Sequence, residues 1–270
     1  MSARETVINS RDNQLVRAAR AVRDGKQREL IFIEGRRLCV EALSAGLIIE
    51  EAFITEEISL NERNEALHRG LLRSGCRTYF VSERVLDSLS DTKTPQGIVL
   101  IARRPAAQTS ALERAINKTT LLIILHRVGN PSNAGSILRT AEAAGACGAI
   151  TTVGSVDIFS PKALRGAMGS SFRLPVWTGA DYAEALAWCR ARGITIVATD
   201  VRAARLYSDF DWTNPAALVV GAEASGLTID EAAQADEAVR IPMHAPVESL
   251  NVGVATAVVL YEAMRQRRVL

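Results

Sequence analysis

The stretch Leu121-Leu-Ile-Ile-Leu125 is a run of aliphatic residues with no polar residue between them. A short run of this kind is typical of a strand that is buried on both faces of a parallel sheet. Similar runs recur through the second half of the chain, at residues 149–153, 174–177, 194–199, 217–221 and 238–241. Stretches with helical spacing lie between and after them, including residues 181–192 and 249–267. The pattern predicts an α/β domain built on a mostly parallel sheet.

The first half of the chain alternates in the same way and predicts a smaller α/β domain. Strands are expected at residues 30–33, 53–55, 78–81 and 97–101, and helices at residues 11–23, 35–45, 62–73 and 83–89. Charged, small polar and proline residues from Arg103 to Ser110 then interrupt the periodicity, as in a linker. We therefore predict a first domain over residues 1–104, a linker and entry segment over 105–117, and a second domain over 118–270.

Composition excludes several classes of protein. With 48% hydrophobic and 23% charged residues, the chain resembles an ordinary globular protein. Its apolar runs fall far short of the roughly 20 residues that span a bilayer, and its start lacks the apolar region of a signal peptide, which predicts a cytoplasmic protein. Its Cys and His residues show no metal-ligand spacing, so no metal is expected. The net charge of +2 is uninformative, although local basic groups such as Arg265, Arg267 and Arg268 could meet phosphate or simply face solvent.

Three polar stretches follow predicted strands of the second domain. They are Asn130-Pro-Ser-Asn133-Ala-Gly135-Ser-Ile-Leu-Arg139, Gly221-Ala-Glu223-Ala-Ser-Gly226-Leu, and Ile241-Pro-Met243 with Ser249-Leu-Asn251-Val. Ligands of parallel α/β sheets bind at the carboxyl ends of strands. Taken singly, each stretch also has a plain structural interpretation, with Asn133 and Ser249 as helix caps and Arg139 in solvent. The glycine spacing fits neither the dinucleotide fingerprint nor the phosphate loop, which argues against a nicotinamide or nucleoside triphosphate enzyme.

In this order, the three stretches resemble the motifs of the SpoU (TrmH-type) RNA 2′-O-ribose methyltransferases of the SPOUT superfamily. The stretch that starts at Phe32-Ile-Glu34-Gly35 is similar to the start of that family's N-terminal substrate-binding domain. The resemblance implies methyl transfer from S-adenosylmethionine to a ribose 2′-hydroxyl. Ribosomal RNA is favoured over transfer RNA because a separate N-terminal domain is present. The alternative from another class is a non-catalytic RNA-binding assembly factor with the same fold.

The resemblance also assigns roles to residues. It implies that the catalytic residues are Arg139, Asn133, Glu223, Ser249 and Asn251, and that the cofactor is bound by Thr199, Gly221, Gly226, Ile241, Met243 and Leu250. Lys162 and Arg165 are candidates for contact with RNA phosphate, with a solvated helix start as the alternative. The chain departs from the family where Gly253 replaces a frequent serine, and where His126 and Asn130 replace frequent acidic residues.

The fold and the assembly that the resemblance implies go beyond what periodicity can predict. The family's C-terminal domain is a deep trefoil knot, although chains almost never thread their loops. Two such domains pair, so a homodimer is expected. The role of Arg139 is left open between orienting the ribose, stabilising negative charge and moving a proton with help from an RNA phosphate, because a guanidinium with a pKa above about 12 stays protonated.

Overall fold

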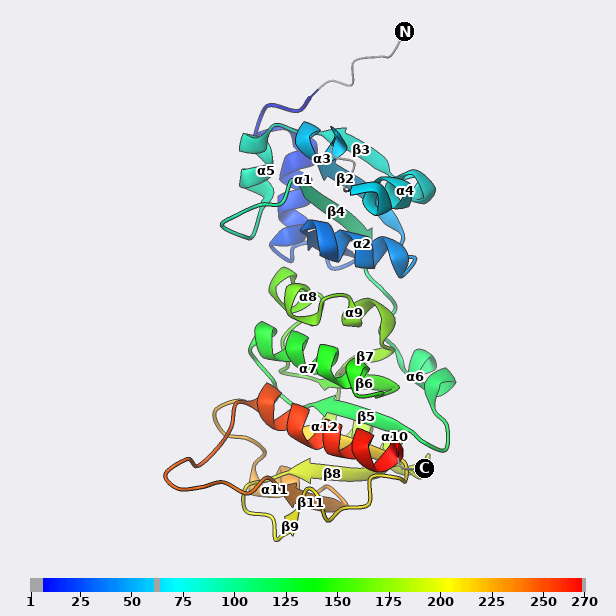
Figure 1. Cartoon of the computed structure of the whole chain (residues 1–270), viewed down its shortest axis with the longest axis vertical. Helices are drawn as coiled ribbons and strands as arrows, with labels where there is room; N and C mark the ends of the chain where they lie inside the picture. Colours follow the sequence, from blue (N-terminus) through cyan, green and yellow to red (C-terminus); the bar gives the residue numbers. More distant parts are fainter. Residues whose placement is uncertain (1–6, 61–63, 269–270) are drawn as a thin grey trace. The chain divides into compact units, whose positions relative to one another are not determined.

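The chain, described by a computed structural model over residues 7–60 and 64–268, divides into two compact units (Figure 1). The first unit comprises the chain up to Pro105 together with Phe159–Phe172. The second comprises Ala106–Ile158 and the chain from Arg173 onward. The segment Phe159–Phe172 therefore leaves the second unit between two of its strands and packs within the first.

In the described part of the first unit, four strands form a sheet in the order β1-β4-β2-β3. β4 (Ile98–Arg103) is antiparallel to both β1 (Leu30–Glu34) and β2 (Ile49–Ile54), whereas β3 (Arg77–Phe80) is parallel to β2. One face carries α1 (Gln14–Arg23) and α5 (Glu83–Leu89), which share a core with the strands. Val16, Ala19 and Val22 of α1 recur at helical spacing and are buried there.

The remaining helices of this unit are α2 (Arg36–Ser44), α3 (Glu56–Leu60), α4 (Glu65–Ser74) and α8 (Pro161–Ala167), with α9 (Ser170–Arg173) at its border. The helix expected at residues 62–73 overlaps α4, and its first two positions lie outside the described residues. The helix expected at residues 83–89 is α5 with the same bounds, and the prediction is confirmed.

In the second unit, the described strands form a seven-stranded sheet in the order β7-β6-β5-β10-β8-β11-β9. The paired neighbours are all parallel. Its strands are β5 (Leu121–Leu125), β6 (Gly148–Thr152), β7 (Val176–Ala180), β8 (Thr195–Thr199), β9 (Arg205–Leu206), β10 (Ala216–Val220) and β11 (Glu237–Arg240). Every residue of β5, β6 and β10 is buried. The mixed α/β class with a mostly parallel sheet is confirmed, and only the two-residue β9 lacked a sequence signal.

Helices cover this sheet on its two faces (Figure 1). They are α6 (Thr109–Ala115), α7 (Pro131–Ala143), α10 (Tyr182–Arg190), α11 (Ile229–Ala232) and α12 (Val252–Arg268). α7 and α12 pack side by side. The segment expected to be a linker contains α6, whose Leu112 is fully buried in the core of the second unit. No helix in the described part of the chain is long and apolar enough to span a membrane.

Two helix starts differ from the sequence-based expectation. α12 begins at Val252 rather than at residue 249, because Asn251 is the capping residue and its Oδ1 accepts from the backbone N–H of Gly253 at 2.9 Å. Ser249 as a helix cap was therefore wrong. Asn133 as a cap was also wrong, since Asn130 caps α7 by accepting from the N–H of Ser132 at 2.9 Å and Pro131 takes the first helical position.

Candidate functional site

The three polar stretches meet because the strands before them end at the same edge of the second sheet. β5 and β10 are paired up to Leu125 and Val220, and β8 ends at Thr199 beside Val239 of β11. Loops that leave these ends bring together residues from distant parts of the sequence. This is the edge at which parallel α/β sheets bind ligands.

Glu223 connects the first two stretches. Its Oε1 accepts a hydrogen bond from the backbone N–H of Asn130 at 2.9 Å and from Nδ2 of Asn133 at 3.1 Å, and its Oε2 accepts from the N–H of Gly129 at 3.1 Å. Partial burial disfavours the ionised carboxylate, but these hydrogen bonds outweigh burial and hold the pKa of Glu223 below its usual value. Glu223 is therefore an ionised group that aligns the 126–130 loop.

The third stretch joins the same network through Asn251. Its Nδ2 donates to Oδ1 of Asn133 at 3.2 Å, while its own Oδ1 caps α12. A continuous set of hydrogen bonds thus runs from Asn251 through Asn133 to Glu223. Residues separated by 118 and 90 positions in the sequence are in direct contact.

Residues 221–226, which we call the glycine loop, form a tight turn after β10. The N–H of Gly226 donates to the carbonyl of Ala222 at 2.8 Å. A Cβ on Gly221 would lie 2.4 Å from the carbonyl carbon of Gly226 and 2.6 Å from the N–H nitrogen of Leu227, so only glycine fits. Gly226 itself has a φ of 62°, in the left-handed region that glycine tolerates. Both glycines keep the backbone free of side chains at the wall of a cavity.

That cavity has a volume of about 380 Å³. Its walls come from the ends of β8, β10 and β11, the loops after them, and the start of α12. All six residues predicted to bind a cofactor line it: Thr199, Gly221, Gly226, Ile241, Met243 and Leu250. Glu223 and Ser249 line it as well, so the hydrogen-bonded network and the cavity share a wall. The volume falls within the range of roughly 300–1,000 Å³ that is usual for small-molecule sites.

The sequence analysis missed the charged residues on the cavity wall other than Glu223, which are Asp200, Arg202, Arg240 and Glu248. Arg202 donates from Nε and Nη2 to the two carboxylate oxygens of Asp200, at 2.9 and 2.8 Å. These hydrogen bonds hold the pKa of Asp200 below its usual value. Asp200 and Arg202 lie within three residues of Thr199, where β8 ends, so the rule that strand ends carry ligand-binding residues would have found them.

Arg139 lies apart from this network. It is exposed on α7, six residues after Asn133, which separates the two by about 9 Å along the helix axis. Within the described residues its guanidinium makes no hydrogen bond to Asn133, Glu223, Ser249 or Asn251. The structure thus brings four of the five predicted catalytic residues to one place and leaves Arg139 facing solvent.

The residues predicted to contact RNA phosphate lie in the first unit. Lys162 is exposed near the start of α8. Arg165 is half-buried and its Nη2 lies 2.7 Å from Oδ2 of Asp91, with Oε2 of Glu34 4.0 Å from Nη1. The charge of Arg165 is therefore directed at carboxylates of its own unit, a partnership that sequence spacing gave no means to foresee.

The C-terminal basic group is also largely committed to the fold. The guanidinium of Arg267 donates to the backbone carbonyls of Trp212 at 2.7 Å, Thr120 at 3.1 Å and Asn214 at 3.0 Å, and closely to that of Thr119. Arg265 pairs with Glu262 on the same helix. The side chain of Arg267 fastens the end of α12 to the starts of β5 and β10, a role that neither alternative of the sequence analysis, phosphate contact or a solvated face, included.

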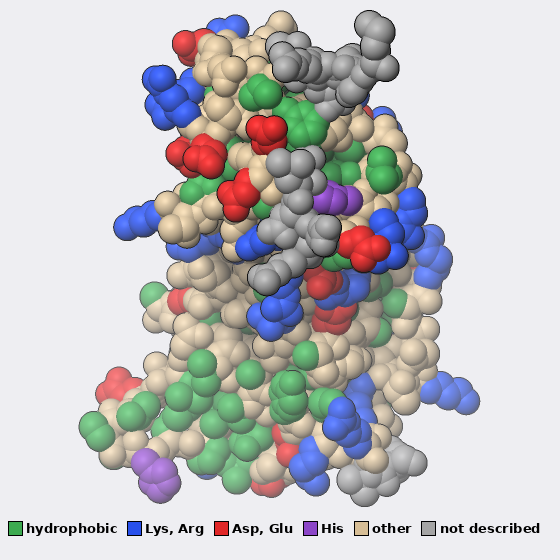
Figure 2. Space-filling model, turned by 45° about the horizontal axis from the view of Figure 1, so that its top comes forward, with side chains coloured by type: hydrophobic (Ala, Val, Ile, Leu, Met, Phe, Trp, Pro, Cys, Tyr) green, Lys and Arg blue, Asp and Glu red, His purple; other side chains and the backbone are tan. Residues whose placement is uncertain are grey.

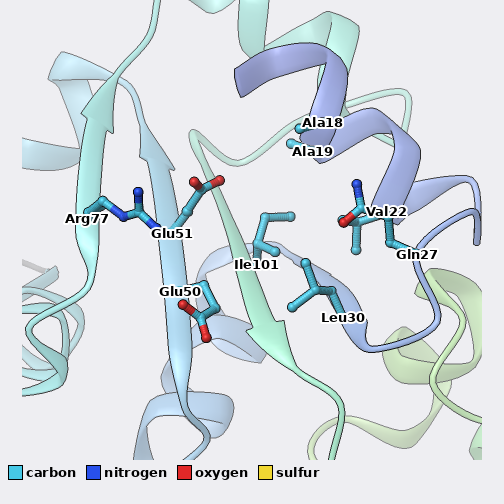
Figure 3. A pocket seen from close by; sticks show the side chains of 9 residues that line it. All are labelled: Ala18, Ala19, Val22, Gln27, Leu30, Glu50, Glu51, Arg77 and Ile101. Atoms are coloured by element: carbon cyan, nitrogen blue, oxygen red, sulfur yellow. The ribbon is translucent and has the colours of Figure 1, made fainter. Parts of the chain in front are cut away.

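A second, smaller cavity of about 220 Å³ lies in the first unit beneath α1 (Figure 3). Apolar residues of α1 and the sheet form most of its wall, and Glu50, Glu51 and Arg77 border it. Burial raises the pKa of Glu51, although the charge of Arg77 opposes the shift. No predicted site residue lines this cavity. Among the described residues, no cluster of His, Cys, Asp and Glu is placed to hold a metal ion.

Comparison with known proteins identifies similar chains over almost the full length. A family model described as the SpoU rRNA Methylase family matches residues 120–261, and one described as RNA 2′-O ribose methyltransferase substrate binding matches residues 32–108. The 23S rRNA (guanosine(2553)-2′-O)-methyltransferase RlmP of Bacillus subtilis is 28% identical over 94% of this chain and 97% of its own.

Solved structures agree with these matches. A crystal structure of an RNA 2′-O ribose methyltransferase is 33% identical and covers 98% of this chain and 100% of its own, with a TM-score of 0.82. An AdoMet-bound rRNA methyltransferase from Sinorhizobium meliloti is 29% identical and covers 96% of this chain and 97% of its own, with a TM-score of 0.85.

Proposed function

Because this chain belongs to the SpoU rRNA methylase family, we propose that it transfers the methyl group of S-adenosylmethionine to a ribose 2′-hydroxyl of ribosomal RNA. The observation that carries the proposal is the shared wall between the 380 Å³ cavity and the network of Glu223, Asn133 and Asn251. A cofactor in that cavity would lie directly beside the polar residues that can hold the accepting ribose.

The cavity fits S-adenosylmethionine in size and in chemistry. Ile241, Met243 and Leu250 offer an apolar wall to an adenine ring, and the side-chain-free backbone at Gly221 permits close approach. Thr199 and the carboxylate of Asp200 offer polar groups to hydroxyls or to an amine. When bound, the cofactor supplies a methyl group activated by its sulfonium.

Asn133, Glu223 and Asn251 organise the acceptor side of the site. Glu223 fixes the 126–130 loop, and Asn251 fixes the Asn133 side chain, so each amide has a set orientation before substrate binds. Preorganisation of this kind is a large source of rate because reacting groups no longer need to be ordered during reaction. Ser249 lies on the same wall.

Arg139 acts as a hydrogen-bond donor in this proposal. Its exposed guanidinium is free to meet the ribose or an adjacent phosphate when RNA arrives. A guanidinium remains protonated, so it stabilises negative charge that develops on the attacking oxygen, and the hydroxyl proton passes to an RNA phosphate or to water.

The substrate is proposed to be ribosomal RNA because the first unit, together with the substrate-binding family match at residues 32–108, provides a separate surface for RNA. We assign residues 1–104 to that role and residues 118–270 to the transferase. Lys162 on α8 is exposed and suits contact with phosphate, whereas Arg165 would first have to exchange its carboxylate partners. A cytoplasmic location is proposed as well.

A homodimer is proposed through the second unit. Val254 and Tyr261 lie seven residues apart on α12, which places them on one face, and they are 51% and 52% exposed. Hydrophobic side chains gather on the second unit in the lower part of Figure 2. Light scattering should give twice the chain mass, and a Tyr261→Glu variant should shift it toward the monomer. The trefoil knot implied by the family resemblance remains a prediction.

The test combines RNA mapping with one variant. Mapping of 2′-O-methyl positions in ribosomal and transfer RNA with and without this gene should reveal one ribosomal position that depends on it. Arg139→Ala should bind S-adenosylmethionine as the wild type does and lose methyl transfer, whereas Arg192→Ala, an exposed arginine paired with Glu113, should retain both. A dependent position in transfer RNA alone, or wild-type turnover in Arg139→Ala, would contradict the proposal.

A further inference from the structure

An ion pair forms a second link between the 126–130 loop and the segment that follows β10. It lies farther along that segment than Glu223, at α11. Arg127 lies two residues after the end of β5, and Glu231 lies in α11, a few residues after the glycine loop. Nη2 of Arg127 makes a close ion pair with Oε1 of Glu231, whose side chain is only 16% exposed. Oε2 of Glu231 accepts from the N–H of Thr228 at 2.9 Å, so one carboxylate caps α11 and binds Arg127 at the same time.

The imidazole of His126 contacts both members of the ion pair. Nε of Arg127 donates to Nε2 of His126 at 3.1 Å, and Nδ1 of His126 lies 3.0 Å from Oγ1 of Thr152. Because Nε2 accepts, we place the imidazole proton on Nδ1 and the ring is neutral. Burial and then the charge of Arg127 lower the pKa of His126 to about 4, which agrees with this assignment.

This arrangement depends on Arg127. Nε2 of His126 lies 3.1 Å from Oε1 of Glu231, so an unshared electron pair would face a carboxylate if the guanidinium were absent. Arg127 also holds a φ of 54°, and a Cβ on neighbouring Gly154 would lie 3.1 Å from its Cγ. A non-glycine residue in this conformation persists only where its surroundings hold it, and such residues cluster at functional sites.

We propose that Arg127 and Glu231 are positioning residues for methyl transfer, whose ion pair fixes the glycine loop against the 126–130 loop so that Glu223 meets Asn130 and Asn133. The inference rests on the proposed function. The contacts of Glu223 join the two loops at the cavity wall. The Arg127–Glu231 pair adds a half-buried contact at the base of both loops, and it sets the shape of the cavity without touching the cofactor. Neither Arg127 nor Glu231 lines that cavity.

A double-mutant cycle tests the pair. Arg127→Gln and Glu231→Gln remove one charge each, and glutamine at position 231 still caps α11 through its amide oxygen. Each single variant should weaken S-adenosylmethionine binding about tenfold in calorimetry without RNA, because it leaves a half-buried charge unpaired. The double variant should also lose about tenfold, rather than the hundredfold of independent effects. Arg127→Lys should restore most of the affinity, and Arg192→Gln, which breaks the exposed pair with Glu113, should change it less than twofold.

A second measurement separates positioning from a general loss of structure. In Arg127→Gln, His126 faces Glu231 without the guanidinium between them, so the pKa of its imidazole should rise above the wild-type value of about 4. Among the described residues, Tyr182 also packs against the ring, and its phenol stays neutral because burial raises its pKa to about 12. NMR titration of the imidazole reports this shift, and an unchanged melting temperature would show that the shift comes from the lost guanidinium and not from unfolding, which would also raise this pKa by exposing the ring.

Wild-type affinity in either single variant, or multiplying losses in the double variant, would overturn the proposal. An unchanged imidazole titration in Arg127→Gln would also overturn it. Failure of the proposed function gives a different result, because then the wild type itself would neither bind S-adenosylmethionine nor methylate RNA, while the imidazole titration would still report whether Arg127 and Glu231 form the pair.

Discussion

Replacing Glu223 by glutamine changes one atom of the network and leaves its shape intact. Oε1 of Glu223 accepts from Asn130 and Asn133, and Oε2 accepts from the N–H of Gly129. A glutamine amide keeps one oxygen and presents an NH₂ group in place of the other. If its oxygen keeps the first two contacts, its NH₂ group faces the N–H of Gly129, and two donors then oppose each other.

The cost follows from that one opposed contact. A hydrogen-bonding group that loses its partner costs about 1–3 kcal/mol, and the exposure of Glu223 places the loss near the lower end because water can reach it. A loss of about 1 kcal/mol corresponds to about a fivefold fall in kcat/KM. Glu223→Ala removes both acceptor oxygens, so about 3 kcal/mol and a fall of about 150-fold are expected.

Methyl transfer to RNA under subsaturating conditions measures both variants, with Glu113→Gln as the control for the same chemical change far from the cavity. The pKa of Glu223 is depressed in the folded chain, so its contribution to stability is present above the pKa of the unfolded chain and is lost as the pH falls through the folded value. The melting temperature of Glu223→Gln should therefore fall below the wild type at pH 7 and match it in acid. Equal kcat/KM for Glu223→Ala and the wild type would refute the role of this network.

Three further changes test other contacts. Gly221→Ala places a Cβ 2.4 Å from the carbonyl carbon of Gly226, an overlap that costs about 1–3 kcal/mol. Calorimetry should show that the cofactor binds at least about fivefold more weakly, and unchanged affinity would contradict close approach of the cofactor to the backbone at Gly221. Arg267→Ala removes the guanidinium from four backbone carbonyls, of which that of Thr120 still accepts from the N–H of Ala216, so the free energy of unfolding in denaturant should fall by about 3 kcal/mol. A loss within error would contradict the role of Arg267 in fastening α12. The pKa of Glu51 is raised in the folded chain, so its contribution to stability is lost as the pH rises through the folded value. Glu51→Gln should therefore have a higher melting temperature than the wild type at pH 7 and the same melting temperature at pH 3. The reverse order at pH 7 would show that the charge of Arg77 outweighs burial.

The strands of the second unit could be predicted because burial on both faces leaves a local signal. Leu121–Leu125 is aliphatic throughout and is a buried central strand. β9, with Arg205 and Leu206, carries no such run and is defined only by its pairing with β11. The start of α12 was misplaced because Ser249 and Asn251 are both good caps, and only the position of the backbone selects Asn251.

The predicted site residues also fall into two groups, those with a local sequence signal and those whose partners come from distant segments. Gly221 and Gly226 were predictable because a tight loop needs residues without side chains. The partners of Arg165 and Arg267 were not, since an arginine near a helix end can face solvent, a phosphate or a carbonyl with the same local sequence. Arg165 meets Asp91 and Arg267 meets backbone carbonyls because distant segments approach them in the fold.

By itself, the sequence determined the class of fold, the family and the identity of the polar residues at the strand ends, because burial, turn chemistry and motif order are local properties. Tertiary structure alone decided which of those residues touch. Glu223 meets Asn133 across 90 positions, and Glu231 meets Arg127 at the base of the same loops. Hydrogen bonds and ion pairs act over a few ångströms, so their partners are set by where parallel strands end in space and not by separation along the chain.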